Sequence, residues 1–227
     1  MIKNYNDFLK TLLNAGFSLG GGNDEGIYVI VSRGWNEEPQ GGSPIHWHTG
    51  DPETDPWEWR MRVLNERNDI AYSKFFFKKS GYITREWYPY FLAARREGLT
   101  FDEADDRGMV SHFARRIYDV VVAGGCVPLH DIKARGGFAK EDKSAFDRAL
   151  VELQMKMFLT MCGSQLKMPM QGWASTEFCT IEKFFGEDIL DESAKINKED
   201  AFEKIHGQVL KLNPLAKDAK IRKFTAG

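Results

Sequence analysis

The chain has 227 residues, enough for one large domain or two small ones, and its hydrophobic (42%) and charged (28%) fractions are ordinary for a soluble globular protein. The formal net charge is -2, so any face that attracts nucleic acid or an acidic surface has to be local. The N-terminus has no apolar signal segment, and no apolar run approaches the length of a membrane span. We therefore expect a cytoplasmic protein with no membrane partner.

Residues 1–108 predict an N-terminal α+β region. The apolar positions of residues 5–15 repeat with the period of a helix, which Gly16 ends. The apolar run 27–31 predicts a strand. The stretch 34–56, rich in Gly, Pro, Asp and Glu, predicts a long irregular connection.

The segment 56–91 is unusually aromatic, and a helix is predicted at each of its ends. Pro56 suits the first turn of a helix with three apolar side chains on its inner face, those of Trp57, Met61 and Leu64. A second helix is predicted over 83–96, and residues 100–103 have the pattern of a capping box that opens a short third helix. We leave open whether residues 55–108 form a degenerate winged helix.

Residues 109–172 carry the clearest fold signal, beginning with three helices. Ser111 suits the N-cap of a helix that ends at Gly124 and Gly125. A short helix follows at 128–133, and a third helix is predicted after Lys140. The apolar stripe of this third helix consists of Phe146, Ala149, Leu150, Leu153 and Met157.

A β-hairpin is predicted immediately after the third helix. Residues 158–162 and 166–170 read as its strands, and residues 163–165 as the turn. Three helices followed by a hairpin is the element order of a winged helix, and each local signal agrees with the next. We therefore predict a winged helix over 109–172.

Residues 173–227 are expected to form a C-terminal helical extension packed on the rest of the chain. A strand and a short helix are predicted within 173–185, followed by a helix that Asn197 caps and that ends before Pro214. The basic tail 215–227 is expected to fray. The predicted fold class is α+β, mostly helical, with a winged-helix unit and short β-hairpins.

The third helix is the element expected to enter a DNA major groove. The candidate nucleic-acid-binding residues are Lys140, Lys143, Ser144 and Arg148 on or beside this helix, with Gln165 and Lys167 at the wing. Acidic side chains among them nearly cancel the local charge, so a structural or protein-binding role is the competing interpretation.

Lysines also alternate with aromatics in the segment 72–79, where Lys74, Lys78 and Lys79 lie beside Tyr72 and Phe75 to Phe77. Bases stack on aromatic rings while lysines bind phosphates, so this pattern suits a single strand or an extruded base. Aromatics also gather in cores for ordinary hydrophobic reasons, and we favour core packing.

Candidates for metal binding and catalysis are few. His46 and His48 lie two residues apart, which on extended backbone directs both to one side, but no third ligand has a fixed spacing. The three cysteines form no CxxC pair and are interpreted as free thiols. Nucleophile-elbow, dinucleotide and P-loop motifs are absent from the sequence. We expect no metal and no cofactor, and we do not identify catalytic residues.

Three segments give the chain a family resemblance: residues 54–60 (TDPWEWR), residues 81–91 (GYITREWYPYF) and the Leu150-x-x-Leu153-Gln154 pattern. They resemble AlkZ-related bacterial proteins, distant relatives of the AlkZ-like winged-helix DNA glycosylases. The resemblance implies tandem winged helices that grip DNA and a Gln-aliphatic-Gln motif that positions water. In this chain no glutamine has Gln, Asp or His two residues further on, so no catalytic residue is transferred.

The leading hypothesis is a DNA-binding winged-helix protein without catalysis. The alternative is a glycosylase-like base-excision enzyme with its pocket in the aromatic region and its catalytic group elsewhere. The third interpretation is a winged helix that binds protein partners or forms a homo-oligomer.

Overall fold

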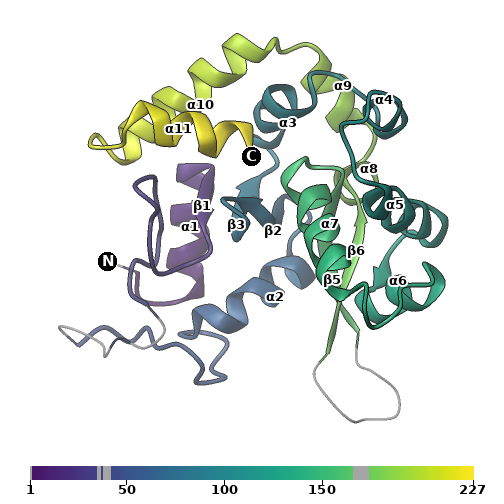
Figure 1. Ribbon diagram of the computed structural model, residues 1–227. Coiled ribbons are helices and arrows are strands. Elements are labelled where there is room, and N and C mark those ends of the chain that lie inside the picture. Colours follow the sequence, from purple (N-terminus) through teal and green to yellow (C-terminus); the bar gives the residue numbers. More distant parts are fainter. Residues whose placement is uncertain (1, 35–36, 38–41, 166–173) are drawn as a thin grey trace.

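The computed structural model describes residues 2–34, 37, 42–165 and 174–227, and in these residues the chain forms eleven helices and six strands. The strands form two antiparallel sheets of three strands each, so the fold class is α+β. Figure 1 shows α1 and β1 on one side of the molecule, α5, α6 and α7 on the other, and β2 and β3 between them. None of the described helices has the length and apolar content that a membrane span requires.

The first sheet belongs to a unit built from the N-terminal part of the chain. Its elements are α1 (Tyr5–Ala15), β1 (Phe17–Leu19), α2 (Pro56–Glu66), β2 (Ile70–Phe76) and β3 (Lys79–Thr84), and the strand order is β1-β3-β2. The Asn4 side chain caps α1 by accepting from the Asp7 amide, and Gly16 ends the helix at a φ of 87°. These local signals confirm the helix predicted over 5–15.

Three predictions in this unit are wrong in detail. Residues 27–31 form no strand, because their pairing with β1 is a single bridge between Leu19 and Val29. The inner face of α2 consists of Trp59, Val63 and Leu64, whereas Trp57 and Met61 are only partly buried. The predicted helix 83–96 is shorter, because Ile83 pairs with both Phe17 and Ala71 in the sheet and α3 (Tyr88–Arg96) begins five residues later.

The second sheet belongs to a unit built from residues 112–180. Its elements are α5 (His112–Gly124), β4 (Val127–Pro128), α6 (Leu129–Arg135), α7 (Lys143–Met155), β5 (Leu159–Gln165) and β6 (Ser175–Thr180), and the strand order is β4-β6-β5. Ser111 caps α5, as predicted. A capping box formed by Thr100 and Glu103 opens α4 (Phe101–Asp106), whose Phe101 stacks on Tyr118 of α5.

The hairpin of this unit differs from the predicted one. Residues 163–165 are not a turn, because β5 continues through Gln165 and is irregular only between Met161 and Gly163. The partner strand is β6, in which Phe178 enters the core, so the unit extends past the predicted limit at residue 172. The strand predicted at 166–170 lies outside the described residues.

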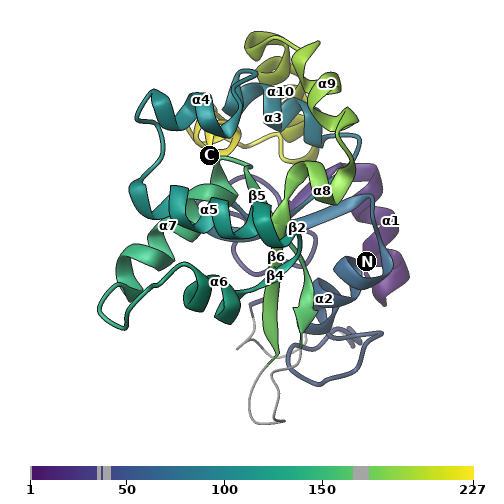
Figure 2. The same cartoon turned by 90° about the vertical axis from the view of Figure 1, so that its right-hand side faces the viewer.

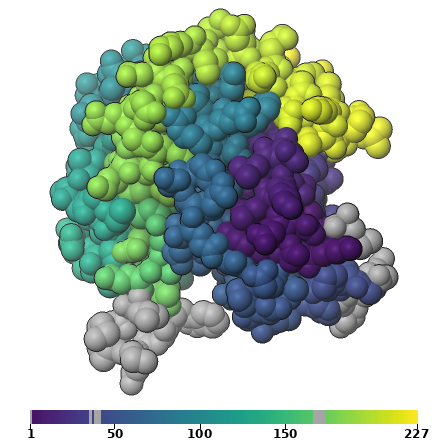
Figure 3. Space-filling model, turned by 180° about the vertical axis from the view of Figure 1, so that it is seen from behind, coloured from purple at the N-terminus to yellow at the C-terminus, as the bar shows by residue number. Residues whose placement is uncertain are grey.

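The C-terminal part of the chain folds back over both units. Here β6 continues into α8 (Ile181–Phe185), which α9 (Asp188–Ala194), α10 (Lys198–Leu212) and α11 (Asp218–Ala226) follow (Figure 2). The predicted frayed tail is wrong, because Ile221 and Phe224 of α11 are fully buried and the Phe224 ring stacks on Phe76 at 4.1 Å. Figure 3 shows the N-terminal segment in contact with the C-terminal helices on the back face.

Gln154 of α7 joins the two units. Its side chain is 1% exposed, donates to the Leu150 carbonyl of its own helix at 2.8 Å, and accepts from the Ser73 hydroxyl at 2.8 Å and the Lys74 amide at 3.0 Å. The bonds to Ser73 and Leu150 are buried, so each satisfies a donor or acceptor that burial would otherwise leave unpaired. Gln154 therefore fixes the position of α7 on β2.

Candidate nucleic-acid interface and aromatic pocket

The outer face of α7 borders a groove of about 910 Å³. We call this the α7 groove, and its lining residues are Lys74, Lys78, Glu141, Lys143, Ser144, Asp147, Arg148, Val151, Glu152, Met155, Lys156, Ala226 and Gly227. The buried stripe of α7 turns Phe146, Leu150 and Leu153 into the core, and this orientation leaves Lys143, Ser144 and Arg148 exposed.

The side chains of the α7 groove carry a local excess of positive charge. Five are cationic (Lys74, Lys78, Lys143, Arg148 and Lys156) and three are acidic (Glu141, Asp147 and Glu152), a difference of two in a chain whose net charge is -2. Lys156 is paired with Glu152 at 3.0 Å. Among the described residues, Lys74, Lys78, Lys143 and Arg148 have no ion-pair partner. They are therefore available to an anionic ligand.

The structure brings three of the predicted contact residues together. Lys143, Ser144 and Arg148 line the α7 groove, and Arg148 donates to the Ser144 hydroxyl at 2.7 Å. Lys140 is exposed in the turn that precedes α7, and Gln165 is exposed at the end of β5, outside the groove lining. Lys167 lies outside the described residues.

Lys74 and Lys78 belong to the groove, although the sequence associated them only with the aromatic run. They lie on and just after β2, which packs against α7 through Gln154. No local pattern predicts that contact between residues about eighty positions apart. The core interpretation of the neighbouring aromatics is confirmed, because Phe75 and Phe76 are fully buried.

Arg95 lies beneath the α7 groove and forms hydrogen bonds with the backbone of three elements around it. Its guanidinium donates to the carbonyls of Phe75, Met155, Phe224 and Thr225 at 2.7–2.9 Å. Burial lowers the pKa of Arg95 to about 9, which leaves the group protonated at neutral pH. This one cation therefore ties β2, the end of α7 and α11 together.

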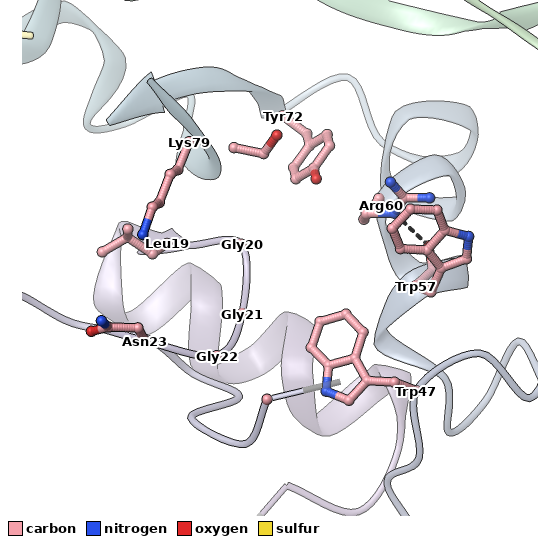
Figure 4. A pocket seen from close by; sticks show the side chains of 12 residues that line it. Leu19, Gly20, Gly21, Gly22, Asn23, Trp47, Trp57, Arg60, Tyr72 and Lys79 are labelled. Carbon is pink, nitrogen blue, oxygen red and sulfur yellow. Dashed lines mark hydrogen bonds between the residues drawn. The ribbon is translucent and has the colours of Figure 1, made fainter. Parts of the chain in front are cut away.

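A second hollow, of about 470 Å³, lies in the N-terminal unit. We call it the aromatic pocket, and its lining residues are Leu19, Gly20, Gly21, Gly22, Asn23, Gly34, Trp47, Trp57, Arg60, Tyr72, Lys79 and Ser80. Figure 4 shows the rings of Trp47, Trp57 and Tyr72 approaching one space from three separate segments. The Arg60 guanidinium lies 3.3 Å from the centre of the Trp57 ring, and its Nε donates to the Trp57 carbonyl at 2.7 Å.

Two features of the backbone hold these rings in place. A side chain at Gly21 would come within 2.4 Å of the Trp47 ring, so the glycine permits the close approach of loop and indole. Asp55 is fully buried and accepts from the amides of His48, Gly50 and Trp57 at 2.8–3.0 Å. Asp55 thus caps α2 and closes the loop that carries Trp47.

The described lining of the aromatic pocket suits a flat ring. It includes aromatic faces, glycine backbone and a stacked guanidinium. Such a surface can stack with a nucleic-acid base of any identity.

One family model matches nearly the whole chain. The family model described as "AlkZ related" matches residues 2–226. The chain belongs to the AlkZ-related family. This membership relates it to the DNA-repair glycosylases of the AlkZ type. No curated protein and no solved structure matches the chain.

Gln154, part of the Leu150-x-x-Leu153-Gln154 pattern, makes buried contacts in this AlkZ-related chain. Its amide oxygen accepts from Ser73 and Lys74 of β2, and its amide nitrogen donates to the Leu150 carbonyl within α7. It therefore presents no group to either hollow, and its role is structural.

Among the described residues, the two histidines singled out as metal candidates do not meet a third ligand. Both are exposed, and His48 has a φ of 60° while its ring packs against Trp57 at 4.8 Å. In the described part of the chain, no group of three His, Cys, Asp or Glu ligand atoms includes His46 or His48.

Proposed function

We propose that this protein binds duplex DNA through the outer face of α7. In this proposal residues 112–180 form a winged-helix unit, with α7 in the major groove and the β5–β6 hairpin as the wing. The order helix, strand, helix, helix and hairpin, with the first strand beside the last, supports that interpretation. Membership of the AlkZ-related family supports DNA as the ligand.

The observation that carries the proposal is the set of unpaired cations on the α7 groove. Lys143 and Arg148 project from the exposed face of α7, and Lys74 and Lys78 face the same groove from the neighbouring unit. Phosphate neutralisation supplies much of the affinity of DNA-binding proteins, so local cations matter more than net charge. Lys143 and Ser144 occupy the first turn of α7, whose amide groups favour an anion.

Charge reversal on α7 tests the proposal. The double variant Lys143→Glu, Arg148→Glu should bind plain duplex at least about 100-fold more weakly than the wild-type chain at low salt. The matched control is Lys211→Glu, Lys217→Glu, which reverses two exposed lysines on and after α10 and should bind normally. Fluorescence anisotropy gives the affinities, and circular dichroism checks that both variants are folded. Equal loss in the two variants contradicts the proposal.

A second proposed activity is supported by the aromatic pocket: the reception of an extruded base without its cleavage. Stacking between Trp47, Trp57 and Tyr72 would offset the loss of stacking in the duplex, about 1–3 kcal/mol for each aromatic contact.

A duplex with 2-aminopurine at a mismatch tests this activity. Base reception predicts a change in fluorescence on binding that is absent in Trp57→Ala and retained in Trp57→Phe. Incubation with alkylated DNA distinguishes the enzymatic alternative, because release of a free base would establish a glycosylase. Self-association without affinity for any DNA would instead favour the protein-partner interpretation.

A further inference from the structure

Three cysteines that are far apart in the sequence meet on the second sheet. The Sγ atoms of Cys126, Cys162 and Cys179 all lie within 4.8 Å of one another. Among the described residues, these three side chains form a group that could hold a metal ion. Cys126 directly precedes β4, Cys162 lies in β5 and Cys179 lies in β6. Two of the strands and the residue just before the third therefore contribute one thiol each.

The register of the sheet explains why the thiols converge. Val127 pairs with Phe178, so the preceding residue of β4, Cys126, comes opposite the following residue of β6, Cys179. On the other side of β6, the irregular pairing between Met161 and Gly163 contains Cys162. A β-bulge changes the direction in which a side chain points, and here it places the Cys162 thiol beside the other two.

We propose that Cys126, Cys162 and Cys179 form a three-thiolate site for a thiophilic cation of the zinc class. Zinc–sulfur bonds are about 2.3 Å long, so the sulfurs of a tetrahedral site lie about 3.8 Å apart. The thiols need to close by about 1 Å at most to reach that geometry. Three protein ligands leave the fourth position of the cation to water or to an added thiol.

The cluster is accessible from one side. Cys179 is buried, Cys162 is half-buried and Cys126 is exposed, so a cation reaches the cluster from the solvent side. On binding, each thiol forms a bond to the cation and releases its proton to solvent.

Titration of the reduced full-length chain with Cd²⁺ tests the proposal. Cd²⁺ is the probe because thiolate-to-cadmium charge transfer absorbs in the ultraviolet. We expect the absorption to saturate at one ion for each chain and the melting temperature to rise, because the ion bridges three strands. Cys126→Ser should weaken binding at least tenfold, and because Cys126 is exposed its variant should stay folded.

A variant on β5 provides the control for this titration. Ser164→Ala alters an exposed residue on β5 close to Cys162 and should bind Cd²⁺ as the wild-type chain does. Absence of the charge-transfer band overturns the proposal, as does equal affinity in Cys126→Ser. A disulfide between two of the three cysteines in the protein as isolated, found by mass spectrometry, also overturns it.

Discussion

The two sheet units of this molecule share a strand order and differ in what their last helix does. In both, the first strand lies beside the third, as β1-β3-β2 and as β4-β6-β5. In the second unit the helix before the hairpin, α7, exposes a cationic face. In the first unit the corresponding helix, α2, faces a long connection that supplies Trp47 and closes the aromatic pocket. The same strand arrangement thus borders an open groove beside α7 and a hollow with aromatic walls beside α2.

The units also differ in how their cores are completed. The core of the first unit includes Phe224 of α11, which contacts Phe17 at 5.3 Å and Phe76 at 4.1 Å. The core around α5 and α7 contains no residue beyond Phe178 among the described residues. The first unit therefore depends on the C-terminal helices, whereas the core of the second is completed by Phe101, Ala104 and Val110 from the segment just before it.

The largest expected effect comes from removing Phe224. Phe224→Ala leaves a cavity among four aromatic rings, those of Phe17, Phe76, Phe77 and Phe91, and should lower the free energy of unfolding by about 4 kcal/mol. Leu215→Ala is the control, because Leu215 is 89% exposed and its loss should change stability by less than about 0.5 kcal/mol. Urea denaturation measures both. Equal stability of the two variants would show that α11 does not complete the core.

The second largest loss of stability is expected at the contact between the two units. Gln154→Leu leaves the Ser73 hydroxyl and the Lys74 amide without their partner, which should lower the free energy of unfolding by about 3 kcal/mol. Gln165→Leu changes an exposed glutamine and should have little effect. Urea denaturation again provides the comparison. An unchanged midpoint for Gln154→Leu would mean that α7 is held on β2 by other contacts.

The connection that closes the aromatic pocket is tested at Asp55. Asp55→Ala removes the cap of α2 and the acceptor of three amides, so the free energy of unfolding should fall by about 2 kcal/mol. Asp55→Asn keeps one capping oxygen and should lose less. Trp fluorescence reports the order of Trp47 and Trp57 at the same time. A larger loss in Asp55→Asn than in Asp55→Ala would contradict a capping role.

The smallest effect concerns the ion pairs of Arg85, which join the first unit to α9. Hydrogen bonding to Arg85 lowers the pKa of Glu192 below its usual 4.5. A lowered folded-state pKa stabilises the protein above pH 4.5, and this contribution is lost as the pH falls through the folded value. The melting temperature of Glu192→Gln should therefore approach that of the wild-type chain in acid. Because these side chains are partly exposed, the difference is small even at neutral pH.

Sequence reasoning succeeded where a few neighbouring residues determine the structure. The caps Ser111 and Asn197 and the capping box at Thr100 each satisfy a helix end locally, and each helix begins as predicted. It failed where distant contacts decide. The α11 helix forms because Ile221 and Phe224 find a distant core, and Ile83 extends a strand because Phe17 and Ala71 lie beside it.

The same limit applies to the candidate sites. Lys143, Ser144 and Arg148 follow from the helical period of α7, since its buried stripe leaves them outside. Lys74 and Lys78 join them only through the packing of β2 on α7. The three cysteines have no spacing that predicts a site, and only the register of the second sheet brings their sulfurs together.

The dependence of DNA affinity on salt tests the central claim most directly, because it counts phosphate contacts and is insensitive to small losses of stability. The slope of log affinity against log salt should be about two smaller in magnitude for Lys143→Glu, Arg148→Glu than for the wild-type chain. The Lys211→Glu, Lys217→Glu variant should keep the wild-type slope. An identical slope in all three proteins would show that the α7 face does not contact DNA.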